Sequence, residues 1–288
     1  MSLSPKGNQP KRYEDNYFFK VDYHGGEALS EFLISLFLES TSFKDFVPYR
    51  YIFPNISKSP SYKPRYSFIP MFQIVLDYFS AKELSLVNSL NQQCVKKSSN
   101  YRRMYVFRYW MEKRYLRLSI KNRVVELQTM IDWYSNCQVS HSAILRYFSA
   151  FVTLDTMFVN TDRHFQNFCL MFDNDLGVYR TSLLFDQGFS LDVGEGSLFL
   201  RKARTIRSNQ IKMQPFGTTL KGNMKAVDWY TYDFDIIKFV ELLKGELPNW
   251  GVLDMSGQWR FMKHQLVTYY PQDINGVNTL DYLTSVGL

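Results

Sequence analysis

Three polar side chains near the middle of the chain have the types and the spacing that phosphoryl transfer requires. Asp162 and Asn167 lie five positions apart, between a predicted helix and a short predicted strand. Asp186 follows a second short predicted strand, within the segment Leu-Phe-Asp-Gln-Gly that ends at Gly188. This spacing of an aspartate and an asparagine, followed by an aspartate–glycine turn, is typical of the catalytic and metal-binding loops of kinases.

The chemistry explains why these residue types occur in this order. Phosphoryl transfer needs an incoming hydroxyl aligned with the γ-phosphate, and a Mg²⁺ ion that neutralises the phosphate charge. Asp162 is predicted to orient and deprotonate the hydroxyl, as a catalytic base. The amide oxygen of Asn167 and the carboxylate of Asp186 are hard oxygen ligands suited to Mg²⁺. Either motif alone is more often an ordinary cap or turn, so the prediction depends on both occurring in sequence.

The elements that must position these residues divide the chain into two predicted parts. Residues 1–70 read as strands with one helix, because residues 25–40 carry apolar side chains at helical spacing. Strands are expected within 13–23, 46–53 and 62–69. Residues 71–288 read as mostly helical, with helices expected at 73–91, 100–114, 124–134, 140–158, 233–243 and 259–270, short strands at 167–172 and 181–185, and a loop-rich stretch from 188 to 225.

The expected fold class is therefore α+β: a bilobal, protein-kinase-like fold with a small β-rich N-lobe and a mostly helical C-lobe. The string Thr-Asp-Arg-His-Phe-Gln-Asn at 161–167, with Leu-Leu-Phe-Asp-Gln-Gly at 183–188, resembles the HipA-like serine/threonine kinases, including the compact CtkA-type members. Residues 18–31 look like the lysine strand and first helix of that family, and residues 5–11 are similar to its phosphate loop. Residues 213–217 also look like a family segment.

The resemblance implies an ATP- and Mg²⁺-dependent kinase that phosphorylates a serine or threonine of a protein, possibly of itself. Gly7, Asn8 and Gln9 would form the phosphate loop. Lys20 would hold the α- and β-phosphates as a point charge, positioned by Glu31 or by Glu27, which lie on one helix face. The backbone near Phe68 would contact adenine between the lobes.

Several alternatives stay open at the level of sequence. The phosphate loop has one glycine and no serine or threonine between Gly7 and Arg12, so autophosphorylation within this loop is not predicted. His164 could act as a base or stabilise developing charge, as in phosphoinositide-type lipid kinases, or it could be a structural hydrogen-bonding residue. A lipid or small-molecule kinase, and a catalytically silent pseudokinase that acts as a binding module, are the rival functions.

The amino-acid composition limits the classes of protein and of partner that remain to be considered. Apolar residues make up 45% of the 288 positions, which excludes disorder for most of the chain. The three cysteines form no Cys-x-x-Cys pair, and no segment reads as a signal peptide or a membrane span, so a cytoplasmic protein is expected. The formal charge of +7 favours anionic partners: a nucleotide, a protein substrate, and an antitoxin or nucleic acid. A basic cluster after Asp186 comprises Arg201, Lys202, Arg204, Arg207 and Lys212.

Overall fold

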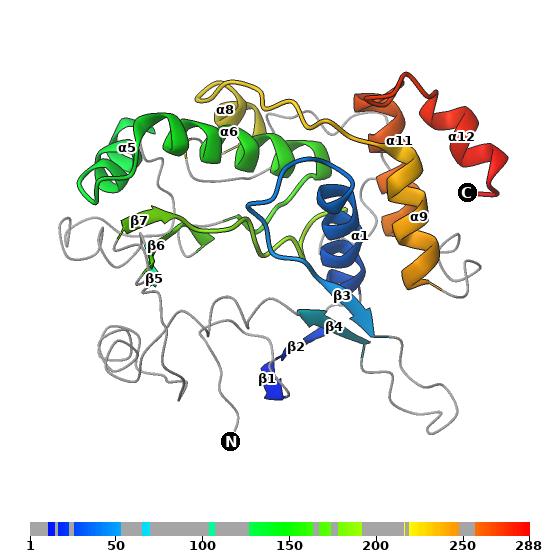
Figure 1. The fold of residues 1–288 in the computed structure, drawn as a ribbon, viewed down its shortest axis with the longest axis horizontal. Coiled ribbons are helices and arrows are strands. Elements are labelled where there is room, and N and C mark those ends of the chain that lie inside the picture. Colours follow the sequence, from blue (N-terminus) through cyan, green and yellow to red (C-terminus); the bar gives the residue numbers. More distant parts are fainter. Residues whose placement is uncertain are drawn as a thin grey trace.

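The computed structural model combines helices with two small antiparallel sheets (Figure 1). It describes residues 11–14, 17–22, 26–52, 65–69, 104–106, 127–163, 167–173, 178–191, 216, 219–247 and 257–288, and for most strand residues it describes the backbone alone. The helices gather on one side of the molecule, and the sheet nearest the N-terminus lies on the other side. Within the described ranges, no helix combines the length and apolar character needed to cross a bilayer.

The first sheet has four strands in the order β1-β2-β4-β3. Its strands are β1 (Lys11–Glu14), β2 (Tyr17–Asp22), β3 (Arg50–Ile52) and β4 (Arg65–Ile69). Lys20 stands opposite Lys11 on one side and Ser67 on the other, so β2 is an inner strand. The second sheet has the order β5-β6-β7, with β5 (Met104–Val106), β6 (Cys169–Asp173) and β7 (Val178–Thr181).

Helix α1 (Glu27–Glu39) connects the first sheet to the helical side of the molecule. It packs against β2, β3 and β4, and also against α9 (Ile236–Glu246) and α11 (Gly257–Tyr269). Because it is enclosed by both groups of elements, every residue of α1 except Leu29 and Glu39 is buried. The other described helices are α5 (Leu127–Ser135), α6 (His141–Phe158), α8 (Leu220–Met224) and α12 (Thr279–Ser285).

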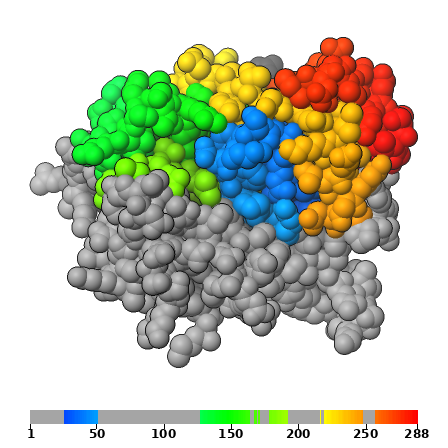
Figure 2. All heavy atoms as spheres, in the orientation of Figure 1, coloured from blue at the N-terminus to red at the C-terminus, as the bar shows by residue number. Residues whose placement is uncertain are grey.

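An aromatic cluster forms the centre of the core where α1 meets the helical side. The ring of Phe37 lies 5.0 Å from that of Phe158 in an edge-to-face arrangement, and 5.2 Å from the ring of Phe234 in a stacked one. Tyr232 and Tyr270 complete the cluster. Aromatic pairs at these separations add to the free energy gained by burial. In Figure 2, residues 26–50 lie between the helices α5 and α6 and the helix α9.

The sequence-based element predictions hold in most places. Helices at 25–40, 124–134, 140–158, 233–243 and 259–270 are confirmed within a few residues by α1, α5, α6, α9 and α11. The predicted helix at 73–91 lies outside the described residues. Helices α8 and α12 were not predicted from the sequence; they are short and begin at polar N-cap side chains, Thr219 and Asn278.

Two predictions in the second sheet are wrong. A helix was expected over residues 100–114, but Met104–Val106 is strand β5, paired with Cys169–Met171 of β6. The run of apolar and β-branched residues here suits a strand once a partner strand is available. The last strand of the sheet is Val178–Thr181 and not 181–185, because Leu184 bridges to Phe46 instead.

Candidate active site

The loop that carries Asp162 begins where α6 ends. Val159 adopts a left-handed conformation with a φ of 53°, and the Asn160 amide donates to the carbonyl of Asp155 at 2.9 Å. A β-branched residue in this conformation is uncommon and stores about 1–3 kcal/mol of strain. The next residue, Thr161, donates its amide to the Phe189 carbonyl at 3.3 Å, so the loop contacts the segment that contains Asp186.

The side chain of Asn160 connects this loop to the second motif. Its oxygen accepts from the Asp162 amide at 3.1 Å, which closes a local turn. Its amide nitrogen donates to the Asp186 carbonyl at 3.2 Å and to Gln187 Oε1 at 3.1 Å. It also lies 3.2 Å from Asp155 Oδ1. One buried amide therefore joins the end of α6, the Asp162 loop and the Asp186 segment.

Arg163 also holds this loop in place. Its guanidinium donates to both carboxylate oxygens of Asp155, at 2.7 and 2.8 Å, and neither side chain is exposed to solvent. The remaining Nη1 donates to the Phe185 carbonyl at 2.8 Å, and the guanidinium carbon lies 4.0 Å from the centre of the Phe151 ring. Arg163 is thus a structural residue that fixes the loop against α6 and against the residue before Asp186.

The charges of this buried pair support each other. Burial by itself lowers the pKa of Arg163, but the charge and hydrogen bonds of Asp155 outweigh it and the pKa is raised. The negative charge of Asp186 acts in the same direction.

Asp186 is held in an unusual backbone conformation by contacts on three sides. Its φ is 64°, a value that aspartate tolerates better than most residues. Its amide donates to the hydroxyl of Tyr49 at 3.2 Å, and its carbonyl accepts from Asn160. Its carboxylate oxygen Oδ2 accepts from the amide nitrogen of Asn167 at 2.6 Å. The structure therefore brings Asn167 and Asp186 into direct contact, from positions 19 residues apart.

The residues before and after Asp186 are also held by hydrogen bonds. Before it, Leu184 exchanges backbone hydrogen bonds with Asp45 and Val47, at 2.8 and 2.9 Å. After it, the carbonyl of Ser190 accepts from the hydroxyl of Ser30 on α1 at 3.0 Å. Leu191, also left-handed, donates to the carbonyl of Phe158 at 2.8 Å. The strained residues Val159, Asp186 and Leu191 thus surround one site, and such strain is commonly concentrated at functional sites.

Asp162 differs from its neighbours because it is exposed, whereas Asn160 and Arg163 are buried. Asn167 is buried and Asp186 is partly buried. Asp162 therefore carries an accessible carboxylate on the loop that Asn160 joins to the Asp186 segment. An accessible carboxylate is what a base needs in order to meet an incoming hydroxyl.

The remaining predicted site residues are less fully described. Lys20 and Phe68 lie in β2 and β4, for which only the backbone is described. Glu27 and Glu31 are both buried on α1, and the structure does not decide which would pair with Lys20. Gly7, Asn8, Gln9 and His164 lie outside the described residues, as does the basic cluster 201–212. Their roles stay predictions.

Sequence reasoning missed four residues that shape the site: Asp155, Asn160, Gln187 and Tyr49. Asp155 carried a usable signal, since it is a single acidic residue in the apolar helix α6, eight positions before Arg163. Asn160 carried a weaker one, because asparagine commonly closes local turns. Tyr49 carried none, because it lies 137 positions from Asp186.

The donor set at Asn167 and Asp186 fits a magnesium ion bound mainly through phosphate and water. Among the described residues, no group of three or more His, Cys, Asp or Glu side chains gathers as a metal cage would require. Mg²⁺ is usually held by one or two side-chain oxygens while substrate phosphates and water complete its shell. One carboxylate beside one carboxamide, on a fixed backbone and partly accessible, meets that requirement.

Comparisons with known proteins give remote structural neighbours. No family model matches the chain, and no curated protein matches it. The crystal structure of CtkA, a Helicobacter pylori proinflammatory kinase, aligns with 98% of this chain and 96% of its own, at a TM-score of 0.49 and 12% identity. HipA of Shewanella oneidensis MR-1, from a complex of a toxin–antitoxin system with HipB and operator DNA, aligns with 99% of this chain and 63% of its own. That match has a TM-score of 0.45 and 11% identity. At these values the comparisons assign the chain to no family.

Proposed function

We propose that this chain is a kinase that transfers the γ-phosphoryl group of ATP, with Mg²⁺, to a hydroxyl group, with a protein serine or threonine as the expected acceptor. The observation that carries the proposal is the contact between Asn167 and Asp186 at 2.6 Å. These two oxygen-bearing side chains come from separate segments, and Asp186 is fixed in a left-handed conformation by Tyr49 and Asn160. The accessible Asp162 follows two positions after Asn160.

Asp162 is the proposed base. Its carboxylate accepts the proton of the acceptor hydroxyl while the hydroxyl oxygen forms a bond to the γ-phosphorus. The bond between that phosphorus and the bridging oxygen breaks, and ADP leaves with the bonding electron pair. The products are the phosphorylated acceptor, ADP and one proton. The turn that Asn160 closes at the Asp162 amide supports this role, because it limits the positions that the carboxylate can take.

Asn167 and Asp186 are the proposed ligands of the metal ion. When bound, Mg²⁺ would neutralise negative charge on the phosphate oxygens. The chain itself contributes the fixed backbone of Asp186, which Arg163 and Asn160 hold through the carbonyls of Phe185 and Asp186. The carboxamide of Asn167 carries an oxygen and a nitrogen, so it can donate to Asp186 and still offer an oxygen ligand.

The rest of the proposed nucleotide site lies toward the first sheet. In the proposed bilobal arrangement, with lobes at 1–70 and 71–288, Lys20 holds phosphate and Glu31, or Glu27, holds Lys20. Gly7, Asn8 and Gln9 close over the phosphates, and the backbone near Phe68 contacts adenine. The burial of both glutamates on α1 supports a charged partner nearby, because an ionised carboxylate is seldom buried alone.

The deciding experiment measures phosphoryl transfer from labelled ATP with Mg²⁺ to the chain itself, to a general protein acceptor, and to lipid vesicles. Wild type is compared with Asp162→Asn and Asp186→Asn. Both replacements keep the shape of the side chain, and asparagine also tolerates a left-handed backbone, so the fold should persist. We expect a loss of about 10²- to 10⁴-fold for Asp162→Asn and a comparable or larger loss for Asp186→Asn.

Asp228→Asn is the matched control, because Asp228 is exposed in the segment after α8, outside the candidate site. It should transfer phosphate at the wild-type rate. Phosphoryl transfer to the lipid vesicles and to neither protein would show that the acceptor is a lipid. Stabilisation by ATP and Mg²⁺ without any transfer would identify a binding module. Full activity of either site variant would overturn the assignment of residues.

A further inference from the structure

A continuous series of polar contacts runs from helix α9 to the backbone amide of Asp186. It begins at Glu246 near the end of α9 and passes through Arg50 and Glu39 to Ser35 on α1. It continues through Tyr49 to the backbone of Asp186. None of these residues except Asp186 has a part in the proposed chemistry, yet the series ends at the proposed metal ligand.

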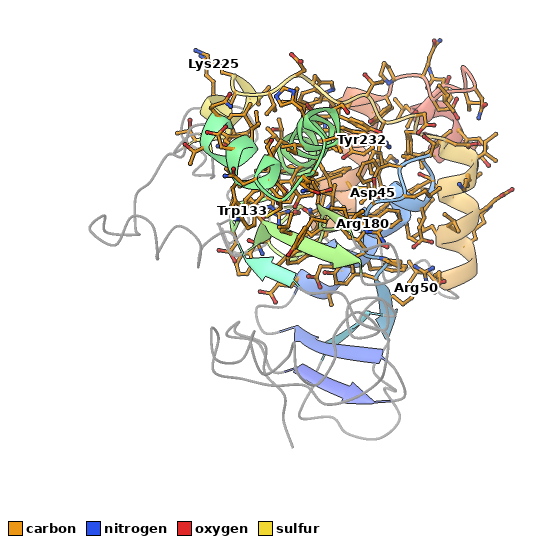
Figure 3. All side chains as sticks on the ribbon, turned by 60° about the vertical axis from the view of Figure 1, so that its left-hand side comes forward. Asp45, Arg50, Trp133, Arg180, Lys225 and Tyr232 are labelled. Carbon is orange, nitrogen blue, oxygen red and sulfur yellow. The ribbon has the colours of Figure 1, made fainter. Side chains whose placement is uncertain are left out.

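The first part of the series is a cluster of charges where three elements meet. Arg50, the first residue of β3, donates two hydrogen bonds to Glu39, the last residue of α1. The same guanidinium lies 3.1 Å from the Glu246 carboxylate of α9. Figure 3 shows Arg50 at this junction, beside β3 and near α9. The cluster therefore fixes the first residue of β3, which directly follows Tyr49.

The second part of the series holds the backbone of Tyr49 against α1. The hydroxyl of Ser35 donates to Glu39 at 3.1 Å and accepts from the amide of Tyr49 at 2.8 Å. Ser35 is buried, and Tyr49 is 5% exposed. Arg50 also donates to the Tyr49 carbonyl at 3.1 Å. Both backbone polar groups of Tyr49 are thus bound, which restricts the direction in which its side chain can extend.

The last contact joins the Tyr49 hydroxyl to the Asp186 amide. A left-handed conformation at a residue other than glycine persists only where surrounding contacts enforce it. The hydrogen bonds to the backbone of Asp186 come from opposite directions, with Tyr49 at its amide and Asn160 at its carbonyl. Loss of either contact would let the peptide rotate, and the carboxylate would move with it.

We infer that Tyr49 is a positioning residue for the proposed metal ligand Asp186, and that it couples the ligand to the packing of α1 against β3 and α9. The inference rests on the proposed function. It assigns Tyr49 no contact with nucleotide or with the reacting atoms. Its hydroxyl acts only through the orientation of Asp186, so its removal should weaken metal use more than it weakens the fold.

Tyr49→Phe tests this, because it removes one oxygen and keeps the ring. Two quantities are measured: the exchange rate of the Asp186 amide hydrogen with solvent, and the Mg²⁺ concentration that gives half-maximal phosphoryl transfer. Both should rise by about 3- to 10-fold, which corresponds to the usual net contribution of one hydrogen bond. The melting temperature should fall no further than in the control below.

Tyr232→Phe is the matched control. The Tyr232 hydroxyl is buried, and it donates to a backbone carbonyl, that of Ala150, at 2.8 Å. Tyr232 packs in the aromatic cluster of the core and does not contact Asp186. We expect Tyr232→Phe to lower the melting temperature about as much as Tyr49→Phe does. It should leave the exchange rate of the Asp186 amide and the Mg²⁺ dependence of phosphoryl transfer unchanged.

The two measurements separate the inference from the proposed function. An unchanged exchange rate of the Asp186 amide in Tyr49→Phe would overturn the inference, whatever the activity. Faster exchange with an unchanged Mg²⁺ dependence would overturn it as well, because Tyr49 would then be only structural. A wild-type chain that neither binds ATP with Mg²⁺ nor transfers phosphate would overturn the proposed function and the inference with it, even where the exchange rate confirms the contact.

Discussion

Within the described residues, two pairs of a guanidinium and a carboxylate are alike in chemistry and differ in burial. In the first, Arg163 pairs with Asp155 of α6, and both side chains are 0% exposed. In the second, Arg50 pairs with Glu39 at the end of α1, and the side chains are 27% and 17% exposed. Glu246, the third member of the second group, is 39% exposed. The first pair fixes the loop of Asp162, and the second begins the series of contacts that reaches Asp186.

The difference in burial decides what each pair contributes. Removing one partner of a buried pair leaves an uncompensated charge in the interior, whereas removing one partner of an exposed pair lets water replace it. Burial raises the pKa of Asp155, and the charge and hydrogen bonds of Arg163 oppose this effect without cancelling it. We therefore expect Arg163 to matter more for the stability of the fold around the site, and Arg50 to matter mainly for the orientation of its neighbours.

The largest effect should follow from Arg163→Met. We expect a loss of about 3–5 kcal/mol in the free energy of unfolding, because the Asp155 carboxylate stays buried without its partner. The melting temperature should fall by about 6–15 °C, as measured by calorimetry. The double variant Asp155→Leu with Arg163→Met should recover part of this loss, since it removes both charges. A loss below about 1 kcal/mol in the single variant would remove the distinction between the two pairs.

A smaller effect is expected from the same replacement at the partly exposed pair, Arg50→Met. Its loss in the free energy of unfolding should be about 1 kcal/mol or less at low salt. Salt screens exposed charges over about 10 Å at 0.1 M ionic strength, so this loss should shrink further as salt is added. Denaturant titrations of both variants at low and high salt make the comparison, and the loss in Arg163→Met should hardly change. A salt-independent loss in Arg50→Met would contradict this picture.

The smallest effect concerns Asp233, whose carboxylate accepts from the Ser42 amide at 2.7 Å where α1 leads into the next loop. Partial burial raises its pKa, but the hydrogen bonds from Ser42 outweigh it and the pKa is lowered. The stabilisation is therefore present above the ordinary pKa of aspartate and is lost as pH falls through the lowered value. Asp233→Asn should melt about 1 °C below wild type at pH 7, the scale of an exposed contact. The difference should disappear in acid, which thermal unfolding across pH would reveal.

The sequence predicted the elements whose signals are local. Helix α1 follows from apolar spacing, and the helix predicted over 140–158 is α6, which the side chain of Ser140 caps. The order of Asp162, Asn167 and Asp186 indicated that two loops would meet, and the contact between Asn167 and Asp186 agrees with that expectation. The metal itself and the base remain proposals.

What the sequence could not predict depends on partners far along the chain. Residues 104–106 form a strand because Cys169–Met171 pairs with them. The local sequence of residues 100–114 carries no signal for a partner strand so far along the chain. Tyr49 contacts Asp186 only because Leu184 bridges to Phe46 and brings the two segments together. Burial of Arg163 was equally hidden, since an arginine beside a catalytic motif is more naturally assigned to phosphate than to the core.

The burial of α1 has a consequence for how the chain is made. A ribosome releases residues 27–39 long before residues 236–269, against which this helix packs. During that interval its apolar surface, including Phe37, lacks the aromatic partners that complete the cluster. Completion of the core must therefore wait until residues 236–269 have been made, and a nascent chain stalled before α9 would expose the apolar surface of α1 to chaperones or to other chains.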